Sequence, residues 1–342
     1  MKVLQCMAGA EFGGAEAFFT RLIIGLGRAG LDQRVVIRAN GDRARLLRGA
    51  GIEPDELKFG GPLDVGSGRK LGKMIKEYEP DVVMSWMNRA TAAVPRPDGK
   101  FIHVGRLGGY YNLKYYRNCD HLAANTEDIA GYLIKNGWAP ERVHYLPNFV
   151  SAEKAAPLSR STFSTPEGTP LILALGRLHE NKAFDTLLRA VARVPDAYLW
   201  LAGEGPLRGE LEELAEQLGI EPRVRFLGWR DDTEALFASA DIFVCPSRRE
   251  PLGNVVIEAW AQGVPVVAAD SPGPGTLVRH GVSGLLSPID DVQALARSIK
   301  RLADDPGARE ELSRGGRDAY EAEFTESIVV RKYLDFFEKV TA

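Results

Sequence analysis

Cysteine is scarce in this chain of 342 residues. The three cysteines, Cys6, Cys119 and Cys245, are odd in number, far apart, and set in apolar segments that resemble strands. Cysteines in such settings are typical of reduced core residues rather than of disulfides or metal ligands. We therefore expect a cytoplasmic protein whose fold needs no covalent cross-links.

Long apolar runs are absent as well. No stretch approaches the roughly 18 residues that span a bilayer. The first apolar segment, Val3–Met7, is too short for the apolar region of a signal peptide. We expect a soluble cytoplasmic protein, with peripheral attachment to the cytoplasmic face of the inner membrane left open.

The sequence does not carry the dinucleotide-binding fingerprint. Gly9 and the pair Gly13-Gly14 have the wrong spacing, and Arg38 and Asn40 stand at the end of the second predicted strand, where the fingerprint needs an acidic residue. A nicotinamide-dependent enzyme is therefore disfavoured.

Signals for a P-loop and for metal binding are also missing. Five residues instead of four separate Gly66 from Gly72, and Met74 follows Lys73, so kinase or ATPase chemistry loses its main support. No Asp-x-Asp sequence occurs. The histidines show no ligand spacing: His103, His121, His144, His179 and His280. We expect neither a metal ion nor a bound cofactor.

Charge is unevenly distributed along the chain. The formal net charge of −3 at pH 7 does not indicate a nucleic-acid partner. Residues 1–150 hold 21 Lys+Arg against 16 Asp+Glu, and the remainder holds 22 against 30, so the halves carry +5 and −8. The positive first half is compatible with an anionic partner or a membrane surface, and equally with scattered solvated charge.

Short apolar strands alternate with amphipathic helical stretches, a pattern that favours parallel sheets built from βαβ units. In the first half, the expected strands are Lys2–Met7, Gln33–Arg38, Asp81–Trp86, Phe101–Val104 and His121–Ala124, with helices near Ala15–Ala29, Arg69–Glu77 and Thr126–Asn136. In the second half, the expected strands are Leu171–Leu175, Tyr198–Ala202, Val224–Leu227, Ile242–Cys245 and Val264–Ala268, with helices near Ala183–Val194, Leu207–Leu218, Thr233–Ala238, Asn254–Gln262 and Asp291–Ala303.

This pattern predicts an α/β protein with two doubly wound domains of parallel strands. We place the first domain at residues 1–150, a linker rich in Ser, Thr, Pro and Ala at 151–170, and the second domain at 171–324. An amphipathic helix over 325–342 is expected to pack toward the first domain. Ligands of such sheets bind at the carboxyl ends of the strands.

Two cations follow the first strand of the second domain. Arg177 and Lys182 lie in Gly176-Arg-Leu-His-Glu-Asn-Lys182, between a predicted strand and a predicted helix. A guanidinium fork and an ammonium point charge together suit the two negative groups of a diphosphate. The alternative is a pair of solvated cations on a turn.

Two glutamates occupy Glu250-Pro-Leu-Gly-Asn-Val-Val-Ile-Glu258, which leaves a strand and enters a helix. Gly253 permits close approach of the backbone, and the helix amides near Gly253, Asn254 and Val255 are available to an anion. Glu258, on an otherwise apolar helical face, would be costly without a polar partner. Because cations and amides bind phosphates while carboxylates bind sugar hydroxyls, the two segments together predict a nucleotide-sugar site.

The first half holds further candidates. Gly13-Gly14-Ala-Glu16 lies between the first strand and the first helix, where glycines expose helical N–H groups. His103 ends a predicted strand and Arg106 lies in the glycine-rich continuation, so either side chain could touch a substrate. For His103 the alternative is a satisfied position in the core.

With these residues in place, the sequence resembles the family 4 (group 1) retaining glycosyltransferases of the GT-B architecture, which share a Glu-x7-Glu motif. The resemblance rests on Gly13-Gly14-Ala15-Glu16, Gly176-Arg177-Leu178 with Lys182 and Asp185, Ala202–Pro206, Phe226–Gly228, Glu250–Gly253 with Glu258-Ala259, and Gly263–Val267. Arg106–Asn112 and Asp120-His121 are similar to a bacterial subgroup associated with lipopolysaccharide core or surface glycans.

The resemblance implies an acceptor-binding first domain and a nucleotide-sugar-binding second domain. It implies catalytic roles for Glu250, Arg177 and Lys182, and it places the segment around Trp229-Arg230 near the base. The implied donor-binding residues are Gly13, Gly14, Arg177, Lys182, Gly203, Arg230, Glu250, Leu252, Gly253, Asn254, Val255 and Glu258. The acceptor-side candidates are Glu16, His103 and Arg106. Family members need no metal and transfer with retention, with the leaving phosphate helping to deprotonate the acceptor.

Our main hypothesis is a retaining hexosyltransferase that moves a sugar from a nucleotide-diphosphate sugar to a glycan or glycolipid in lipopolysaccharide or surface polysaccharide synthesis. A UDP-sugar is the favoured donor, with GDP- and ADP-sugars as alternatives. Two other functions stay open. A nucleotide-sugar epimerase of this architecture would isomerise the donor without an acceptor, and a non-catalytic sugar-binding protein would hold free sugar without the nucleotide.

Overall fold

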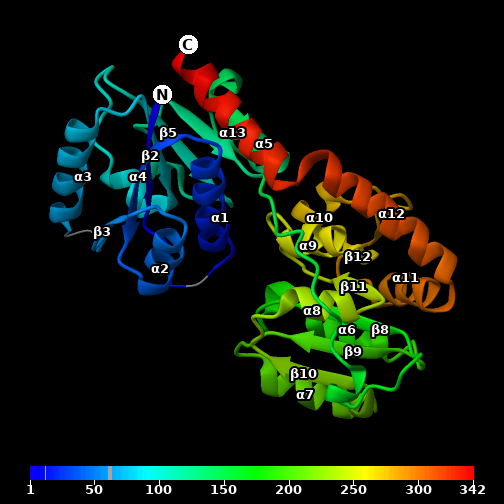
Figure 1. Ribbon diagram of the computed structural model, residues 1–342. Helices are drawn as coiled ribbons and strands as arrows, with labels where there is room; N and C mark the ends of the chain where they lie inside the picture. Colours follow the sequence, from blue (N-terminus) through cyan, green and yellow to red (C-terminus); the bar gives the residue numbers. More distant parts are fainter. Residues whose placement is uncertain (12, 61–63) are drawn as a thin grey trace. The chain divides into compact units, whose positions relative to one another are not determined.

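The computed structural model describes residues 1–11, 13–60 and 64–342 (Figure 1). The chain divides into two compact units. The first unit contains Met1–Phe149 together with Glu326–Ala342, and the second contains Val150–Thr325.

The first unit is built on a parallel sheet of seven strands in the order β3-β2-β1-β4-β5-β6-β7. The strands are β1 (Lys2–Met7), β2 (Asp32–Arg38), β3 (Asp55–Leu57), β4 (Val82–Trp86), β5 (Ile102–Leu107), β6 (His121–Ala124) and β7 (Val143–Tyr145). The helices are α1 (Gly14–Arg28), α2 (Gly41–Gly49), α3 (Val65–Tyr78), α4 (Met87–Ala93), α5 (Glu127–Lys135) and α13 (Glu326–Thr341), with 3-10 turns η1 (Leu113–Tyr115) and η2 (Pro140–Arg142).

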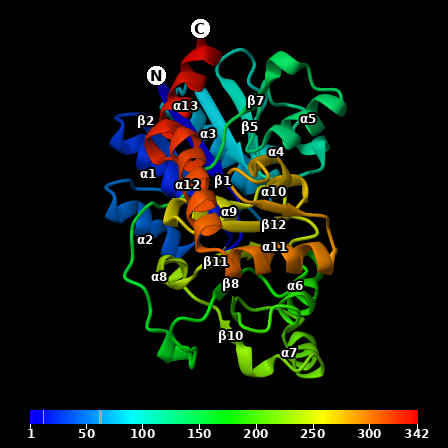
Figure 2. The same cartoon turned by 90° about the vertical axis from the view of Figure 1, so that its right-hand side faces the viewer.

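Helices cover both faces of this sheet because successive strand residues point to opposite sides. On β1, Val3 and Met7 join the core under α1, α2 and α13, whereas Leu4 and Cys6 join the core under α3 and α4. The C-terminal helix α13 lies beside α1 (Figures 1 and 2), and its Tyr333 is fully buried.

The second unit repeats the design with six parallel strands in the order β10-β9-β8-β11-β12-β13. The strands are β8 (Leu171–Leu175), β9 (Tyr198–Ala202), β10 (Val224–Gly228), β11 (Ile242–Cys245), β12 (Val266–Ala269) and β13 (Leu285–Ser287). The helices are α6 (Phe184–Val191), α7 (Arg208–Gln217), α8 (Thr233–Ser239), α9 (Asn254–Gln262), α10 (Pro272–Leu277), α11 (Val292–Asp304) and α12 (Pro306–Glu323), with 3-10 turns η3 (Arg160–Phe163), η4 (Glu180–Lys182) and η5 (Glu221–Arg223).

Two apolar cores flank the second sheet. One lies under α6, α7 and α11, and the other under α8, α9 and α12, with α12 running along α9 (Figure 2). Both units are therefore doubly wound parallel α/β structures, which confirms the predicted fold class.

Residues 151–170, predicted as a linker, belong to the second unit. Leu158 and Phe163 pack against its core, and the carbonyl of Phe163 accepts a hydrogen bond of 2.6 Å from Nε of Arg225. The Ser- and Pro-rich composition of this segment gives no indication that these two residues anchor it to the core.

The prediction for the fifth strand was too short. Strand β5 runs from Ile102 to Leu107 instead of ending at Val104. Gly105 lies inside it, and a Cβ atom there would come within 2.7 Å of Cδ1 of Tyr116. The glycine that suggested a loop is therefore the residue that lets Tyr116 pack against the strand.

No helix in the described part of the chain is long and apolar enough to cross a membrane.

Candidate functional site

Four predicted residues of the second unit follow neighbouring strands. Arg177 comes after β8, Gly203 after β9, Arg230 after β10 and Glu250 after β11. Because all these strands are parallel, their carboxyl ends meet at one edge of the sheet. The order of the strands reverses between β8 and β11, and such a switch point is where open α/β sheets bind ligands.

Lys182 and Glu250 form an ion pair across this switch point. Nζ of Lys182 donates a hydrogen bond to Oε2 of Glu250, and the side chains are 22% and 14% exposed. Burial by itself would lower the pKa of Lys182, but attraction by Glu250, with smaller contributions from Cys245 and Glu258, raises it above its ordinary value. The edge of the sheet therefore holds a fixed ammonium beside a carboxylate.

Arg177 supplies a second cation next to this pair. Its side chain is exposed, and no hydrogen bond or ion pair joins it to another residue in the described ranges. The preceding Gly176 has a φ of +148°, and a Cβ atom there would lie 3.2 Å from Cε of Lys182. Glycine thus lets the strand turn without displacing Lys182.

Gly203 shapes the edge of the sheet through its backbone. It has a φ of +139°, and a Cβ atom would lie 1.9 Å from the carbonyl oxygen of Gly176. Its N–H group donates to the carbonyl of Gly228 at 2.7 Å. Gly203 therefore follows β9 and contacts the ends of β8 and β10, and its N–H group already donates a hydrogen bond.

The segment from Glu250 to Glu258 caps the edge. Gly253, with a φ of +81°, precedes α9, whose first N–H groups, at Asn254 and Val255, lie at the positive end of the helix dipole. Leu252 is buried. Glu258 is half-buried and close enough to Lys182 to raise its pKa. Carboxylates, a cation and helix amides therefore come together, as a sugar diphosphate would require.

Helix α10 fixes this segment from the other side. The N–H of Gly273 donates to the carbonyl of Glu250 at 2.8 Å, and a Cβ atom on Gly273 would lie 2.5 Å from that oxygen. This hydrogen bond holds the backbone of Glu250, and a residue larger than glycine does not fit at position 273.

Arg248 was missed by the sequence analysis and supports Lys182 indirectly. Its guanidinium contacts Asp185 at 2.8 Å and Asp290 at 2.7 Å, and it donates to the carbonyl of Glu180 in η4 at 2.8 Å. Hydrogen bonds to the two aspartates raise the pKa of Arg248. Its position two residues before Glu250 could have pointed to Arg248. Its partners could not be predicted, because they are far from Arg248 in the sequence.

Arg230 is bound within its own turn. Nε donates to Oδ1 of Asp232 at 2.8 Å, and the guanidinium lies 5.5 Å from the ring centroid of Phe163. The neighbouring Trp229 is 73% exposed. An open aromatic surface therefore stands beside an arginine that is already paired.

In the first unit, Glu16 holds the loop after β1. Its Oε1 accepts a hydrogen bond of 2.7 Å from the N–H of Ala10, and Arg43 donates to the carbonyl of Ala10 at 2.9 Å. Gly13 and Gly14 are exposed at the start of α1. Glu16 itself is only 7% exposed, so its observed contacts shape the loop.

His103 has no exposed surface. Its Nε2 lies 2.9 Å from Oγ of Ser85, and its Nδ1 lies 3.2 Å from the carbonyl of Asn118. Burial lowers the pKa of His103 to about 4, so the ring is neutral near pH 7. This burial and these contacts are those of a core histidine.

Arg106 lies at the end of the same strand and is also buried, with 2% of its surface exposed. Its guanidinium lies 4.7 Å from the ring centroid of Trp86 and 5.1 Å from that of Phe18, and it donates a hydrogen bond to Asn148. The sequence analysis missed Trp86 and Asn148, because nothing near Arg106 in the sequence points to them.

No group of three or more His, Cys, Asp or Glu side chains in the described ranges is arranged to hold a metal ion.

Two family models match this chain, and two relatives match it over almost its full length. Residues 12–154 match the family model described as Glycosyltransferase Family 4, and residues 157–319 match Glycosyl transferases group 1. The chain is 38% identical over 336 residues to the "Lipopolysaccharide core biosynthesis glycosyltransferase LpsE" of Rhizobium meliloti (strain 1021), covering 98% of each protein. It is 36% identical over 344 residues to LpsD of the same strain, covering 100% of this chain and 99% of LpsD.

Among solved structures, Anabaena HepE in complex with UDP superposes with a TM-score of 0.88 at 22% sequence identity, over 99% of this chain and 100% of that chain. The likeness confirms the predicted GT-B fold. Similarity over almost the full length of LpsE, with matches to both family models, also confirms the resemblance found in the sequence. The chain belongs to the family 4 (group 1) glycosyltransferases.

Proposed function

We propose that this enzyme transfers a sugar, with retention and without a metal ion, from a nucleotide-diphosphate sugar to a glycan or glycolipid acceptor in the synthesis of lipopolysaccharide core. The observation that carries the proposal is the Lys182–Glu250 pair at the switch point of the second sheet, beside the exposed Arg177 and the start of α9.

In this proposal the second unit binds the donor. Arg177 and Lys182 take the diphosphate together with the amides of Asn254 and Val255, since fixed cations and helix amides stabilise phosphate oxygens. Glu258 accepts hydrogen bonds from ribose hydroxyls, and Glu250 from hydroxyls of the sugar. The first unit binds the acceptor.

The same groups account for a reaction without a metal. The bond from the anomeric carbon to the phosphate breaks, and the negative charge that develops on the diphosphate falls on Arg177, Lys182 and the amides of α9. Preorganised donors of this kind commonly make the largest contribution to catalysis. The oxygen of the acceptor hydroxyl bonds to the anomeric carbon on the face that the phosphate leaves, and its proton passes to the departing phosphate, so the anomeric configuration is kept.

The identities of donor and pathway rest on similar proteins. Anabaena HepE, with the same fold, was crystallised with UDP, which supports a UDP-sugar as donor. LpsE and LpsD carry the description lipopolysaccharide core biosynthesis glycosyltransferase, which supports this pathway and, with it, a cytoplasmic location at the inner membrane. Neither description mentions epimerisation or binding of free sugar.

A thermal-shift screen with UDP, GDP, ADP and their sugar conjugates, in the presence of EDTA, tests the proposal. A ligand that binds only the folded state raises the melting temperature. We expect a shift with UDP that is lost in Lys182→Ala and kept in Lys135→Ala, which removes an exposed lysine of α5. Absence of a shift with every nucleotide, or a shift only after a divalent metal is added, would contradict the proposal.

A further inference from the structure

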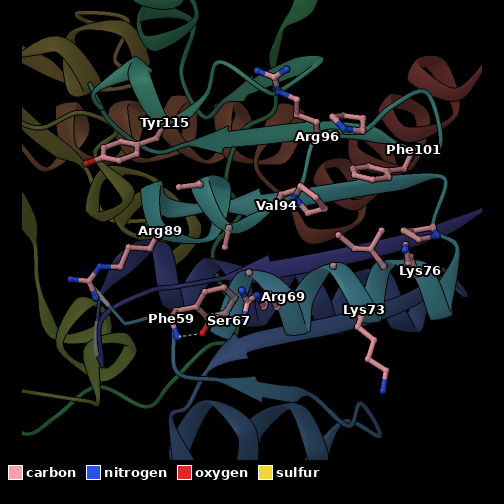
Figure 3. A pocket seen from close by; sticks show the side chains of 18 of the residues that line it. Phe59, Ser67, Arg69, Lys73, Lys76, Arg89, Val94, Arg96, Phe101 and Tyr115 are labelled. Atoms are coloured by element: carbon pink, nitrogen blue, oxygen red, sulfur yellow. Dashed lines mark hydrogen bonds between the residues drawn. The ribbon is translucent and has the colours of Figure 1, made fainter. Parts of the chain in front are cut away.

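A groove in the first unit lies between α3 and the segment 88–101, with a volume of about 1750 Å³ (Figure 3). Its floor is apolar and includes Phe59, Val94 and Phe101, which are all buried. Pockets for small ligands usually measure about 300–1000 Å³. The groove therefore suits an elongated ligand or an array of several small groups.

Positive charge is concentrated around this groove. Seven cationic side chains line it: Arg69, Lys73, Lys76, Arg89, Arg96, Lys100 and Lys114. They come from both walls, with Arg69, Lys73 and Lys76 on α3 and Arg89 and Arg96 opposite (Figure 3). Only three carboxylates line it, so the excess is four, against an excess of five over the whole of residues 1–150. The charge of the first half is thus gathered in one place rather than scattered.

The carboxylates of the groove do little to neutralise these cations. Asp64 caps α3, and hydrogen bonds to the hydroxyl of Ser67 and to backbone N–H groups lower its pKa to about 2. Lys73 is 3.5 Å from Glu77 on the same helix. Six cations make no ion pair within the described ranges: Arg69, Lys76, Arg89, Arg96, Lys100 and Lys114. Such a surface invites an anion from outside the chain.

Two glycines of α3 leave space on the side of the helix that lines the groove. A Cβ atom on Gly68 would lie 3.6 Å from the carbonyl of Ala93, and one on Gly72 would lie 4.0 Å from Cγ of Pro95. Glycine is disfavoured inside a helix, and here it leaves space along the groove that a larger side chain would fill.

We propose that this groove binds the phosphate-bearing headgroups of an anionic lipid bilayer. Exposed cations with few acidic partners attract such headgroups, and the apolar floor suits the lipid backbone better than it suits a fully hydrated anion. The site is separate from the donor residues of the second unit and does not depend on the proposed reaction. It would hold the enzyme at a membrane where lipid-linked acceptors are found.

The test is sedimentation of the full-length protein with vesicles of phosphatidylcholine alone, or mixed with an equal amount of phosphatidylglycerol. The groove variant carries Arg69→Gln, Lys76→Gln, Arg96→Gln and Lys100→Gln. A matched control removes four exposed cations of the same unit that lie outside the groove, through Arg45→Gln, Arg117→Gln, Lys135→Gln and Arg142→Gln. We expect salt-sensitive binding to the mixed vesicles alone. The groove variant should bind roughly 600-fold more weakly, since each of the four basic residues near such a surface contributes roughly a fivefold factor.

A second variant distinguishes binding inside the groove from attraction by the net positive charge of the surface. Gly72→Leu fills the space without changing the charge, and we expect it to weaken vesicle binding several-fold. Unchanged binding in Gly72→Leu, equal binding to neutral vesicles, or equal losses in the control would overturn the proposal. A further outcome would be that vesicles do not bind, while inorganic phosphate stabilises the unmodified protein but not the groove variant. That outcome would assign the groove to a soluble anion and overturn the lipid assignment.

The thermal shift with UDP, measured in parallel, keeps the two proposals apart. The groove variant should retain that shift, because none of its four positions belongs to the donor site. Vesicle binding without a thermal shift by UDP would support the proposed lipid binding in the groove and would contradict the proposed reaction.

Discussion

Lys182 donates a hydrogen bond to Glu250 across a separation of 68 residues. The two residues follow β8 and β11, the strands at which the order of the second sheet reverses. The pair holds an ammonium group and a carboxylate in one place, and in the proposed function these groups bind phosphate and sugar hydroxyls. Such preorganisation lowers the cost of ordering these groups on binding.

Lys182→Ala should reduce transfer on the order of a hundredfold or more, because a donor aimed at the developing charge is lost. It should also destabilise the protein by about 1–3 kcal/mol, because Glu250 is left as a mostly buried carboxylate without its partner. Steady-state kinetics and urea denaturation measure the two effects. In Lys182→Ala with Glu250→Ala the stability should largely recover while activity stays low. Equal destabilisation in the single and double variants would argue against a coupled pair.

Gly203→Ala should destabilise the second unit by about 3 kcal/mol or more, since the new Cβ atom would lie 1.9 Å from the carbonyl oxygen of Gly176 at a φ of +139°. Urea denaturation measures the loss. The matched control is Gly209→Ala, inside α7, where a Cβ atom meets nothing within 4 Å. The control should gain about 0.5–1 kcal/mol, and similar losses at both positions would contradict the steric argument.

The family resemblance places the segment around Trp229-Arg230 near the base, so the exposed ring of Trp229 could stack on it. Trp229→Ala should then weaken binding of the donor nucleotide by about fivefold or more, because stacking contributes on the order of 1–3 kcal/mol. Stability should change little, since the residue is 73% exposed. Titration calorimetry with UDP measures the affinity, and Trp229→Phe should keep most of it. An unchanged affinity in Trp229→Ala would remove this residue from the donor site.

The unfolding free energy should fall as the pH drops from about 6.5 toward 4, in part through His103. Burial lowers the pKa of His103 to about 4, below the value of an unfolded histidine. Between these two values the unfolded chain takes up a proton that the native protein does not, so acid favours unfolding. The contribution is fully present above pH 6.5 and amounts to roughly 3 kcal/mol.

Urea denaturation between pH 7 and pH 4.5 checks this dependence. His103→Gln should flatten the slope, although its stability at pH 7 will be lower because the ring is lost from the core. The same substitution at the exposed His280 should leave the slope as it is. A slope in His103→Gln equal to that of the unmodified protein would place the acid sensitivity elsewhere.

Local sequence patterns were sufficient for much of the architecture. Alternation of apolar runs with amphipathic stretches predicts parallel strands, and a residue that directly follows such a strand must lie at the carboxyl edge of the sheet. The sequence alone therefore places Arg177 and Glu250 at a common edge. The short edge strands β3, β7 and β13 escaped prediction because three residues at a border carry almost no periodic signal.

Only the tertiary structure decided which side chains meet. His103 and Arg106 look alike as candidates in the sequence, yet both are buried, one beside Ser85 and the other between aromatic rings. Likewise, the cations of the groove come from α3, from α4, from the loop that follows α4 and from η1. The reason is physical: strand and helix preferences act over a few neighbouring residues, whereas contacts such as Lys182 with Glu250 depend on strand order and register across the whole sheet.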